Sequence, residues 1–413
     1  MGNISYFCIV KRFRSFLRTL LLIIFLLLTN SNSIASAQDT GLASMDSVEI
    51  SLLTCQPRQN VYSLYGHTAI RIENRSTGYD LVVNYGLFNF KKPFFVLRFV
   101  FGLTDYEMGI ESFADFQYEY GRVGCGVKQQ VLRLSREDKM AILEAIDVNY
   151  RPENRVYRYN YFYDNCTTRA RDILLRNMKS GKVMYASKAK DTTFRKMIHQ
   201  YNGNHLWARA GNDLLLGVKA DAPTNFSDQQ FLPFNLSADF AKAKVVVDGK
   251  SSPLVTRTFW AIVPGAEAGA DGGGFPLDPA ACALLLLVVV LTVCAIDHWR
   301  KKISWGFDLI LLLADGIAGL ILLAMVFSEH PTVSLNLQIL LLNPLWIVFL
   351  YPTIRSIRRR TPNRWLTIWP IFIIVFYLGA FFQSYAEGMH LLAFSLLVRT
   401  LFVTAEMKKN TTK

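Results

Sequence analysis

The chain has 413 residues, 51% of them hydrophobic, and a formal net charge of +13. The hydrophobic residues concentrate at the start and in the last third of the chain, and much of the positive charge lies in short Lys/Arg runs beside those apolar stretches. Membrane topology explains this placement better than a nucleic-acid surface does, so we expect no nucleic-acid partner.

Residues 1–37 have the pattern of a secretory signal peptide. A basic head with Lys11 and Arg12 precedes an apolar run from Leu20 to Leu28, and the small residues Ala35-Ser36-Ala37 follow. This order predicts cleavage after Ala37, and the short apolar run argues against the alternative of an uncleaved membrane anchor.

Export would place three cysteines in an oxidising compartment. Three thiols cannot all pair within one chain, so a disulfide between Cys55 and Cys125 would leave Cys166 as a thiol. A thiol left over in such a compartment requires an explanation, and nucleophilic chemistry is one.

Five apolar stretches predict an all-α bundle of about five transmembrane helices in residues 279–405. Loops with Lys and Arg alternate with loops that have none, so the positive-inside rule puts the domain before the bundle outside and the tail 406–413 in the cytoplasm. We therefore expect a multi-pass protein of the inner membrane with a periplasmic domain. The stretches are Pro279–Ile296, Phe307–Phe327, Leu337–Tyr351, Trp365–Gln383 and Met389–Ala405.

Three charged residues lie within or at the ends of these stretches, namely Asp308, Asp315 and Arg399. Ionisable residues inside a membrane are functional candidates by default. The alternative is a buried polar pair or a side chain that reaches the interface from a helix end.

A segment rich in Gly, Ala and Pro, residues 264–278, separates the bundle from the exported domain at 38–263. Its composition predicts a flexible tether that lets the domain reach the membrane surface.

The start of the exported domain predicts a strand followed by a β-hairpin. Ser47–Thr54 reads as the first strand, and Tyr65–Ile72 and Leu81–Phe88 flank a polar turn, Glu73–Tyr79. If the turn centres near Arg75–Ser76, His67 lies opposite Asn84. Directly paired residues share a face of the sheet, so their side chains would be neighbours.

Two helices are predicted further along the chain. Ser135–Asn149 begins with a Ser cap and an acidic first turn. The spacing of Ala170–Met178 indicates a second helix, and we place Cys166, just before this stretch, in its first turn. The positive end of a helix dipole lowers the pKa of a thiol placed there and so favours the reactive thiolate.

An imidazole within hydrogen-bond reach would complete a nucleophilic pair with Cys166. His67 is the best candidate, because His199 and His205 lie in a polar, less ordered region and the other three histidines flank membrane stretches. The plain alternatives are a Cys166 that only packs as a small apolar residue and a His67 with a structural role. No metal cluster, phosphate-binding loop or serine nucleophile motif is evident in the sequence.

Several stretches resemble known families. Gly66-His67-Thr68 and Asp164-Asn165-Cys166 look like the paired motifs of permuted papain-like enzymes, in which His precedes Cys along the chain. More closely, the exported domain resembles the Lnb-type lipoprotein N-acyltransferases of Bacteroidota, and the layout of a signal peptide and C-terminal helices matches as well. The stretches that carry this resemblance are Ser51–Cys55, Val61–Ile72, Val83–Phe90 and Tyr150–Ile173.

The resemblance implies an α+β permuted papain-like periplasmic domain followed by the helical bundle. It implies an acyltransferase that moves an acyl chain from a phospholipid donor to the N-terminal amine of a diacylglyceryl lipoprotein acceptor, without a cofactor or metal. Cys166 and His67 would be its catalytic residues. We place a third, orienting residue at Asn84 from the hairpin register and not from a family match.

Two other functions fit the same residues. A membrane-tethered cysteine peptidase or amidase acting on cell-wall peptides would use the same Cys166–His67 pair, although one anchor would suffice for it. A non-catalytic assembly or lipid-handling protein would need Cys166 only for packing. The basic, aromatic segment Lys91–Phe101 could enter an anionic membrane interface or form part of the core.

Overall fold

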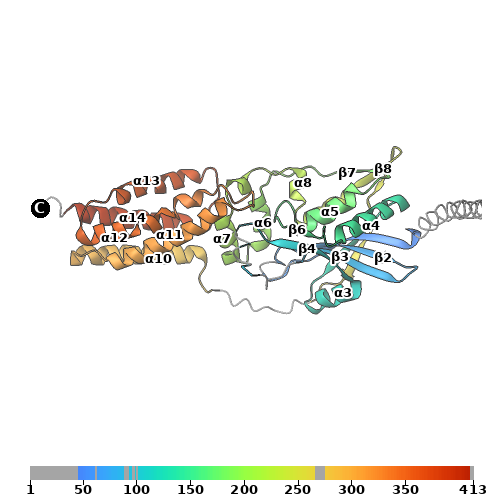
Figure 1. The fold of residues 1–413 in the computed structure, drawn as a ribbon, viewed down its shortest axis with the longest axis horizontal. Helices are drawn as coiled ribbons and strands as arrows, with labels where there is room; N and C mark the ends of the chain where they lie inside the picture. Colours follow the sequence, from blue (N-terminus) through green and yellow to red (C-terminus); the bar gives the residue numbers. More distant parts are fainter. Residues whose placement is uncertain are drawn as a thin grey trace, which may run out of the picture.

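The computed structural model describes residues 45–60, 63–87, 93–94, 98, 101–265 and 275–409. These form an N-terminal α/β domain, residues 45–265, and a C-terminal helical bundle, residues 275–409, placed end to end along the longest axis of the molecule (Figure 1). The predicted signal peptide and most of the segment Lys91–Phe101 lie outside the described residues.

A seven-stranded antiparallel sheet forms the centre of the N-terminal domain, in the order β10-β5-β1-β2-β3-β4-β6. Successive side chains of a strand point to opposite faces, so the sheet contributes residues to a core on each of its faces. The strands are β1 (Val48–Cys55), β2 (His67–Asn74), β3 (Tyr79–Leu87), β4 (Asp105–Ser112), β5 (Val127–Leu132), β6 (Val156–Arg158) and β10 (Val255–Ile262).

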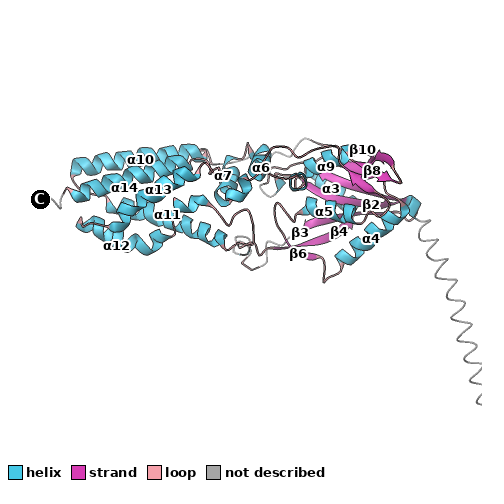
Figure 2. Ribbon diagram, turned by 90° about the horizontal axis from the view of Figure 1, so that it is seen from above, coloured by secondary structure: helices cyan, strands magenta, loops and turns pink. Residues whose placement is uncertain are grey.

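Helices cover both faces of this sheet (Figures 1 and 2). On one face, α4 (Arg136–Tyr150), α5 (Cys166–Arg176) and α9 (Pro233–Lys242) pack against a core that includes Leu52 and Ile70. On the other face, α3 (Phe113–Arg122) packs against a second core with Ala69 and Val82. The short η1 (Met45–Ser47) precedes β1.

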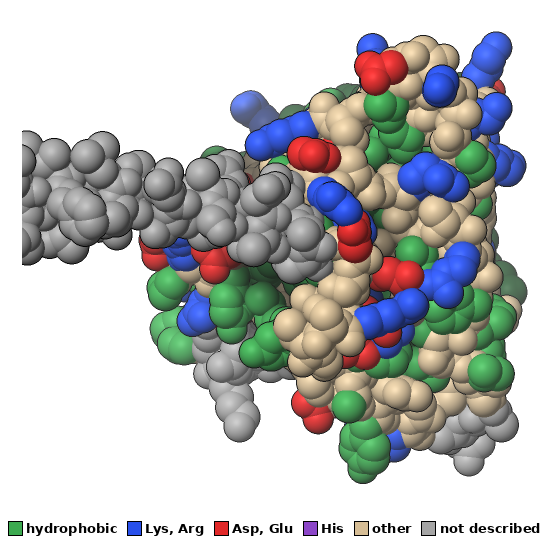
Figure 3. Space-filling model, turned by 90° about the vertical axis from the view of Figure 1, so that its right-hand side faces the viewer, with side chains coloured by type: hydrophobic (Ala, Val, Ile, Leu, Met, Phe, Trp, Pro, Cys, Tyr) green, Lys and Arg blue, Asp and Glu red, His purple; other side chains and the backbone are tan. Residues whose placement is uncertain are grey.

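A small sheet of β7 (Lys182–Met184), β8 (Lys244–Val247) and β9 (Lys250–Pro253) lies at the end of the domain away from the bundle (Figure 1). Seen from that end, Lys and Arg side chains are scattered among Asp, Glu and apolar ones (Figure 3). This mixed surface is typical of a face exposed to water.

A layer of short helices lies between the large sheet and the bundle (Figure 1). It contains α6 (Phe194–Asn202), α7 (Leu206–Leu215) and η3 (Val218–Asp221), and α8 (Phe226–Gln229) follows. His199 lies in α6 and His205 caps α7, so the sequence interpretation of this region as less ordered is wrong.

The bundle contains helices at all five predicted apolar stretches. Among the described residues, four helical segments are long and apolar enough to cross a membrane. The third of these segments, Leu337–Arg359, joins η4 and α12, and α13 is a shorter apolar helix. The helices are α10 (Pro279–Arg300), α11 (Trp305–Val326), α12 (Leu345–Arg359), which follows η4 (Leu337–Leu340), α13 (Arg364–Gly379) and α14 (Met389–Lys408). The predicted architecture of an α/β domain followed by a bundle of about five helices is thus confirmed.

Inside the bundle Arg399 is paired with two carboxylates, whereas Asp315 contacts the backbone. Arg399 of α14 binds Asp308 at 2.6 Å and Asp297 at 2.9 Å, and all three side chains are buried. Asp315 accepts a hydrogen bond from the backbone N–H of Asn343. Arg399, Asp308 and Asp297 thus form a buried ionic contact, which is one of the alternatives that the sequence leaves open.

The predicted first strand, hairpin and helices are present. The hairpin register differs from the prediction by two residues, because the turn spans residues 75–78 and pairs Asn84 with Ala69 instead of His67. A shift by two residues keeps Asn84 and His67 on the same face. Cys55 and Cys125 are both thiols in the structure, not halves of a disulfide.

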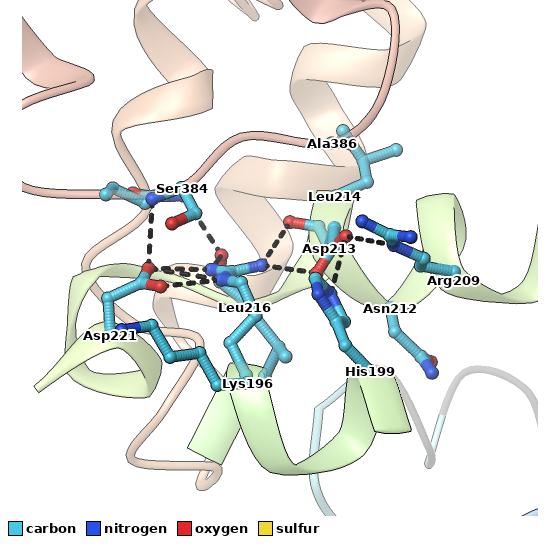
Figure 4. Close-up of polar contacts among 12 residues, drawn as sticks. Lys196, His199, Arg209, Asn212, Asp213, Leu214, Leu216, Asp221, Ser384 and Ala386 are labelled. Carbon is cyan, nitrogen blue, oxygen red and sulfur yellow. Dashed lines mark hydrogen bonds and ion pairs between the residues drawn. The ribbon is translucent and has the colours of Figure 1, made fainter. Parts of the chain in front are cut away.

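A buried ionic cluster connects the layer of short helices to the bundle (Figure 4). The guanidinium of Arg195, only 2% exposed, donates to the carboxylates of Asp213 at 2.8 Å and of Asp221 at 2.9 Å. His199 binds the same Asp213 carboxylate at 2.8 Å. A buried charge requires such compensation, so this cluster holds α6, α7 and η3 together.

Residues at the near end of the bundle bind the same cluster and the backbone around it. Gln338 donates to the carbonyl of Asp213 at 2.9 Å, Gln383 donates to the carbonyl of Leu216 at 3.0 Å, and the N–H of Ser384 donates to Asp221 at 3.1 Å. The N-terminal domain is therefore docked on the bundle by direct contacts. The predicted tether has residues 266–274 outside the described range.

Replacing Arg195 by Met should destabilise the docked protein, because Asp213 and Asp221 would lose the guanidinium that they share. We expect a loss of about 3–5 kcal/mol in the free energy of unfolding, measured by denaturant titration in detergent. The control is Arg176→Met, which removes an exposed pair with Asp172 and should cost about 1 kcal/mol or less. Equal losses for the two variants would contradict the role given to the cluster.

Candidate active site

The N-terminus of α5 is fixed by the side chain of Asn165. Its Oδ1 accepts from the N–H groups of Thr167 and Thr168, each at 2.9 Å, and its Nδ2 donates to the carbonyls of Tyr161 and Phe231. The Oγ1 of Thr168 in turn accepts a hydrogen bond from the N–H of Asn165, which completes a capping box. Cys166 is thereby held as the first residue of the helix, at the positive end of its dipole.

A glycine determines where His67 begins β2. Gly66 has a φ of +76°, and a Cβ atom there would lie 2.6 Å from the carbonyl oxygen of Cys55. Only glycine fits both the conformation and the space. The chain can therefore turn sharply from the preceding loop into the strand, which places the His67 ring at the end of the sheet.

The start of β2 is joined to the start of α5. The hydroxyls of Thr68 and Thr167 are 3.0 Å apart and both residues are buried. Gly86 of β3 lies beside Cys166, because a Cβ atom at residue 86 would be 3.9 Å from the Cβ of Cys166. The thiol is thus seated against the ends of two neighbouring strands.

The thiol of Cys166 and the ring of His67 lie close enough to shift each other's pKa. Burial raises the pKa of Cys166, but the charge of His67, a hydrogen bond to its ring and further bonds from Thr68 and Thr167 outweigh it, so the pKa lies below its ordinary value. Burial lowers the pKa of His67, but the charge and hydrogen bond of Cys166 and the bond to Asn84 raise it overall. These opposite shifts favour a thiolate–imidazolium pair.

Asn84 binds the far side of the imidazole. Its Oδ1 lies 3.0 Å from Nε2 of His67, and the residue is buried in β3. With Nε2 directed at an acceptor, Nδ1 is the ring nitrogen that remains for the thiol. The structure therefore brings together all three residues that the sequence selects, Cys166, His67 and Asn84.

The sequence interpretation did not find Glu111, which accepts a hydrogen bond from Nδ2 of Asn84. Glu111 lies on β4, a strand that the sequence interpretation did not identify, and the pairing of β4 with β3 brings it to Asn84. A carboxylate in an alternating stretch such as Asp105–Ser112 is the one signal that could have pointed to it.

The thiol of Cys55 differs from that of Cys166 in its pKa, although Cys55 pairs with His67 across the β1–β2 ladder. It is fully buried, and burial raises its pKa well above the ordinary value of a thiol. Within the described part of the chain, no group of three or more His, Cys, Asp or Glu side chains is arranged to hold a metal ion.

The pH dependence of thiol alkylation tests the Cys166–His67 contact. Iodoacetamide should modify Cys166 at a pH below that needed for an ordinary thiol, with Cys55 remaining slow as an internal control. In His67→Ala, burial is no longer opposed by the ring, so the pKa of Cys166 should rise and its profile should move to higher pH. Mass spectrometry of the peptide with Cys166 reads the rate. An unchanged profile in His67→Ala would show that the ring does not act on the thiol.

Two family models match the chain. The Lnb N-terminal periplasmic domain matches residues 36–200, which include His67, Asn84, Glu111 and Cys166, and the Lnb transmembrane domain matches residues 271–411, which include the bundle. Comparisons with curated proteins and with solved structures gave no match. The chain therefore belongs to the Lnb-type proteins, which have a periplasmic domain followed by a C-terminal transmembrane region.

Proposed function

We propose that the protein is a lipoprotein N-acyltransferase, which moves an acyl chain from a phospholipid through a thioester on Cys166 to the N-terminal amine of a diacylglyceryl-cysteine lipoprotein. The observation that carries this proposal is the placement of Cys166 at the start of α5 beside His67 at the start of β2, two ends that the Thr68–Thr167 contact joins, within an Lnb-type chain anchored in a membrane. A low-pKa thiol next to a base is the chemistry that acyl transfer by nucleophilic catalysis requires.

The position of the site relative to the bundle supports lipid substrates. Tyr65, two residues before His67, accepts hydrogen bonds from Asn202 of α6 at 3.3 Å and from Asn212 of α7 at 2.8 Å. These helices belong to the layer that docks on the bundle (Figure 4). The loop that leads into His67 is therefore connected to the membrane domain through a single layer of short helices, which suits substrates that stay in the bilayer.

In the first half-reaction, the Cys166 thiolate attacks the carbonyl carbon of a phospholipid ester. The new C–S bond forms, the ester C–O bond breaks, and the imidazolium of His67 gives its proton to the departing lysophospholipid alkoxide. The backbone N–H of Cys166, at the helix N-terminus, is placed to stabilise the oxyanion. The acyl chain is then held as a thioester, and His67 is neutral.

In the second half-reaction, the lipoprotein amine attacks the thioester. The C–N bond forms and the C–S bond breaks, while neutral His67 takes the proton that the amine loses. This step restores the thiolate–imidazolium pair. Asn84, bound to Nε2 of His67, keeps the ring oriented through both halves and stabilises its charged form.

We further propose that the protein lies in the inner membrane with its C-terminus in the cytoplasm. Basic residues gather where α10 and α12 end and at the end of α14, farthest from the N-terminal domain (Figure 1). The positive-inside rule assigns that end to the cytoplasm and leaves Cys166 in the periplasm.

Lipoprotein mass spectrometry in cells tests this function. In a strain that lacks this gene and any paralogue, the native gene should restore the third acyl chain on lipoprotein N-terminal peptides, and Cys166→Ala should not, because no thioester can form. The control is Cys282→Ala, which removes a thiol of α10 outside the site and should restore the chain fully. Immunoblotting of membranes confirms equal protein levels. A third acyl chain restored by Cys166→Ala would refute the proposal.

A further inference from the structure

Three side chains from adjacent strands, those of His67, Asn84 and Glu111, form a chain of hydrogen bonds that leads away from the Cys166 thiol. His67 of β2 binds Asn84 of β3, and Asn84 donates through Nδ2 to Glu111 of β4. Val82 pairs with Glu111 across the β3–β4 ladder, so Glu111, Val82 and Asn84 share the face that α3 covers. Glu111 is therefore placed behind the catalytic amide, away from the thiol.

An amide side chain presents oxygen and nitrogen in the same shape, so its orientation must be set by its partners. Asn84 faces a ring nitrogen on one side and a carboxylate on the other. An ionised carboxylate only accepts hydrogen bonds, so it binds Nδ2 and turns Oδ1 toward His67. Without this partner, Nδ2 could turn toward Nε2 and favour the wrong tautomer of the ring.

We infer that Glu111 is a positioning residue, which fixes the amide of Asn84 and through it the tautomer of His67 that pairs with Cys166. This inference rests on the proposed catalytic role of that pair. Glu111 has its hydrogen bond with Asn84 and not with the Cys166 thiol or the His67 ring. It therefore acts through Asn84. It stabilises the form of His67 that has a proton on Nε2 and leaves Nδ1 for the thiol.

The charges that face Glu111 make its hold on Asn84 depend on pH. Burial and the nearby carboxylates Glu119 and Asp115 of α3 raise the pKa of Glu111, while the bond from Asn84 and the charge of His67 oppose this. A protonated carboxyl group can donate as well as accept. The orientation of Asn84 is therefore held above the pKa of Glu111 and weakens as the pH falls through that value.

A double-mutant cycle on thiol reactivity tests this inference in the full-length protein in detergent. The readout is the rate of Cys166 alkylation by iodoacetamide at neutral pH, measured on its peptide by mass spectrometry. Glu111→Leu should slow it by about tenfold or more, since the loss of a correct histidine tautomer has cost ~10⁴-fold in a serine protease. Glu111→Gln, which keeps an acceptor without fixing the amide, should have an intermediate effect.

The decisive comparison is made in the Asn84→Ala background. If Glu111 acts through Asn84, adding Glu111→Leu to the Asn84→Ala variant should lower the rate of Cys166 alkylation no further. The matched control is Glu119→Gln, which removes a nearby exposed charge that acts on His67 by its electrostatic field. This variant should change the alkylation rate only slightly, and the change should persist in the Asn84→Ala background. Slow alkylation of buried Cys55 in every variant reports an intact fold.

Two results would overturn the inference: a Glu111→Leu rate no lower than that of Glu119→Gln, or losses from Glu111→Leu and Asn84→Ala that multiply. Alkylation requires no lipid, so the cycle is independent of the substrate. Non-additive losses in a protein that transfers no acyl chain would reject the proposed function and leave the positioning role of Glu111 in place.

Discussion

The site depends on the attachment of one helix N-terminus to the end of the sheet. Asn165 binds two N–H groups of α5 and two carbonyls of neighbouring loops, and the Thr68–Thr167 contact fastens the helix to β2. The position of Cys166 relative to His67 follows from these bonds. If the helix began one residue later or moved along the strand, the thiol would lose both the dipole and the ring.

The second requirement is a fixed relation between this site and the membrane. The Arg195 cluster gathers the short helices, and the bundle loops bind the backbone of the same helices through Gln338 and Gln383. A second set of contacts lies at the other side, where the N–H of Glu329 donates to the carbonyl of Phe101 at 3.0 Å. The domain is thus held against the bundle at more than one point, which suits a catalyst whose substrates do not leave the bilayer.

Local signals in the sequence were sufficient for part of this structure. The cap at Ser135 marks a true helix start, and Cys166 lies in the first turn of its helix as predicted. The hairpin register was wrong by two residues, because a turn at residues 75–78 has no strong type-specific signal. The face of Asn84 was still correct, since side chains alternate with a period of two.

Features that arise from distant pairing could not be predicted in this way. Glu111 reaches Asn84 only because β4 joins β3, and no local pattern reports that pairing. The burial of Arg195 and Asp213 could not be predicted, because burial of charges depends on partners that come from several helices and loops. The polar composition of residues 194–221 therefore suggested less order than the region has.

The most direct test is the search for an acyl group on Cys166 itself. Purified protein incubated with phospholipid, without lipoprotein acceptor, should show a mass increase of one acyl chain on the Cys166 peptide. The adduct should be lost with neutral hydroxylamine, as expected for a thioester, and on addition of a diacylglyceryl lipoprotein. An unmodified Cys166 in protein that still N-acylates lipoproteins would contradict the account.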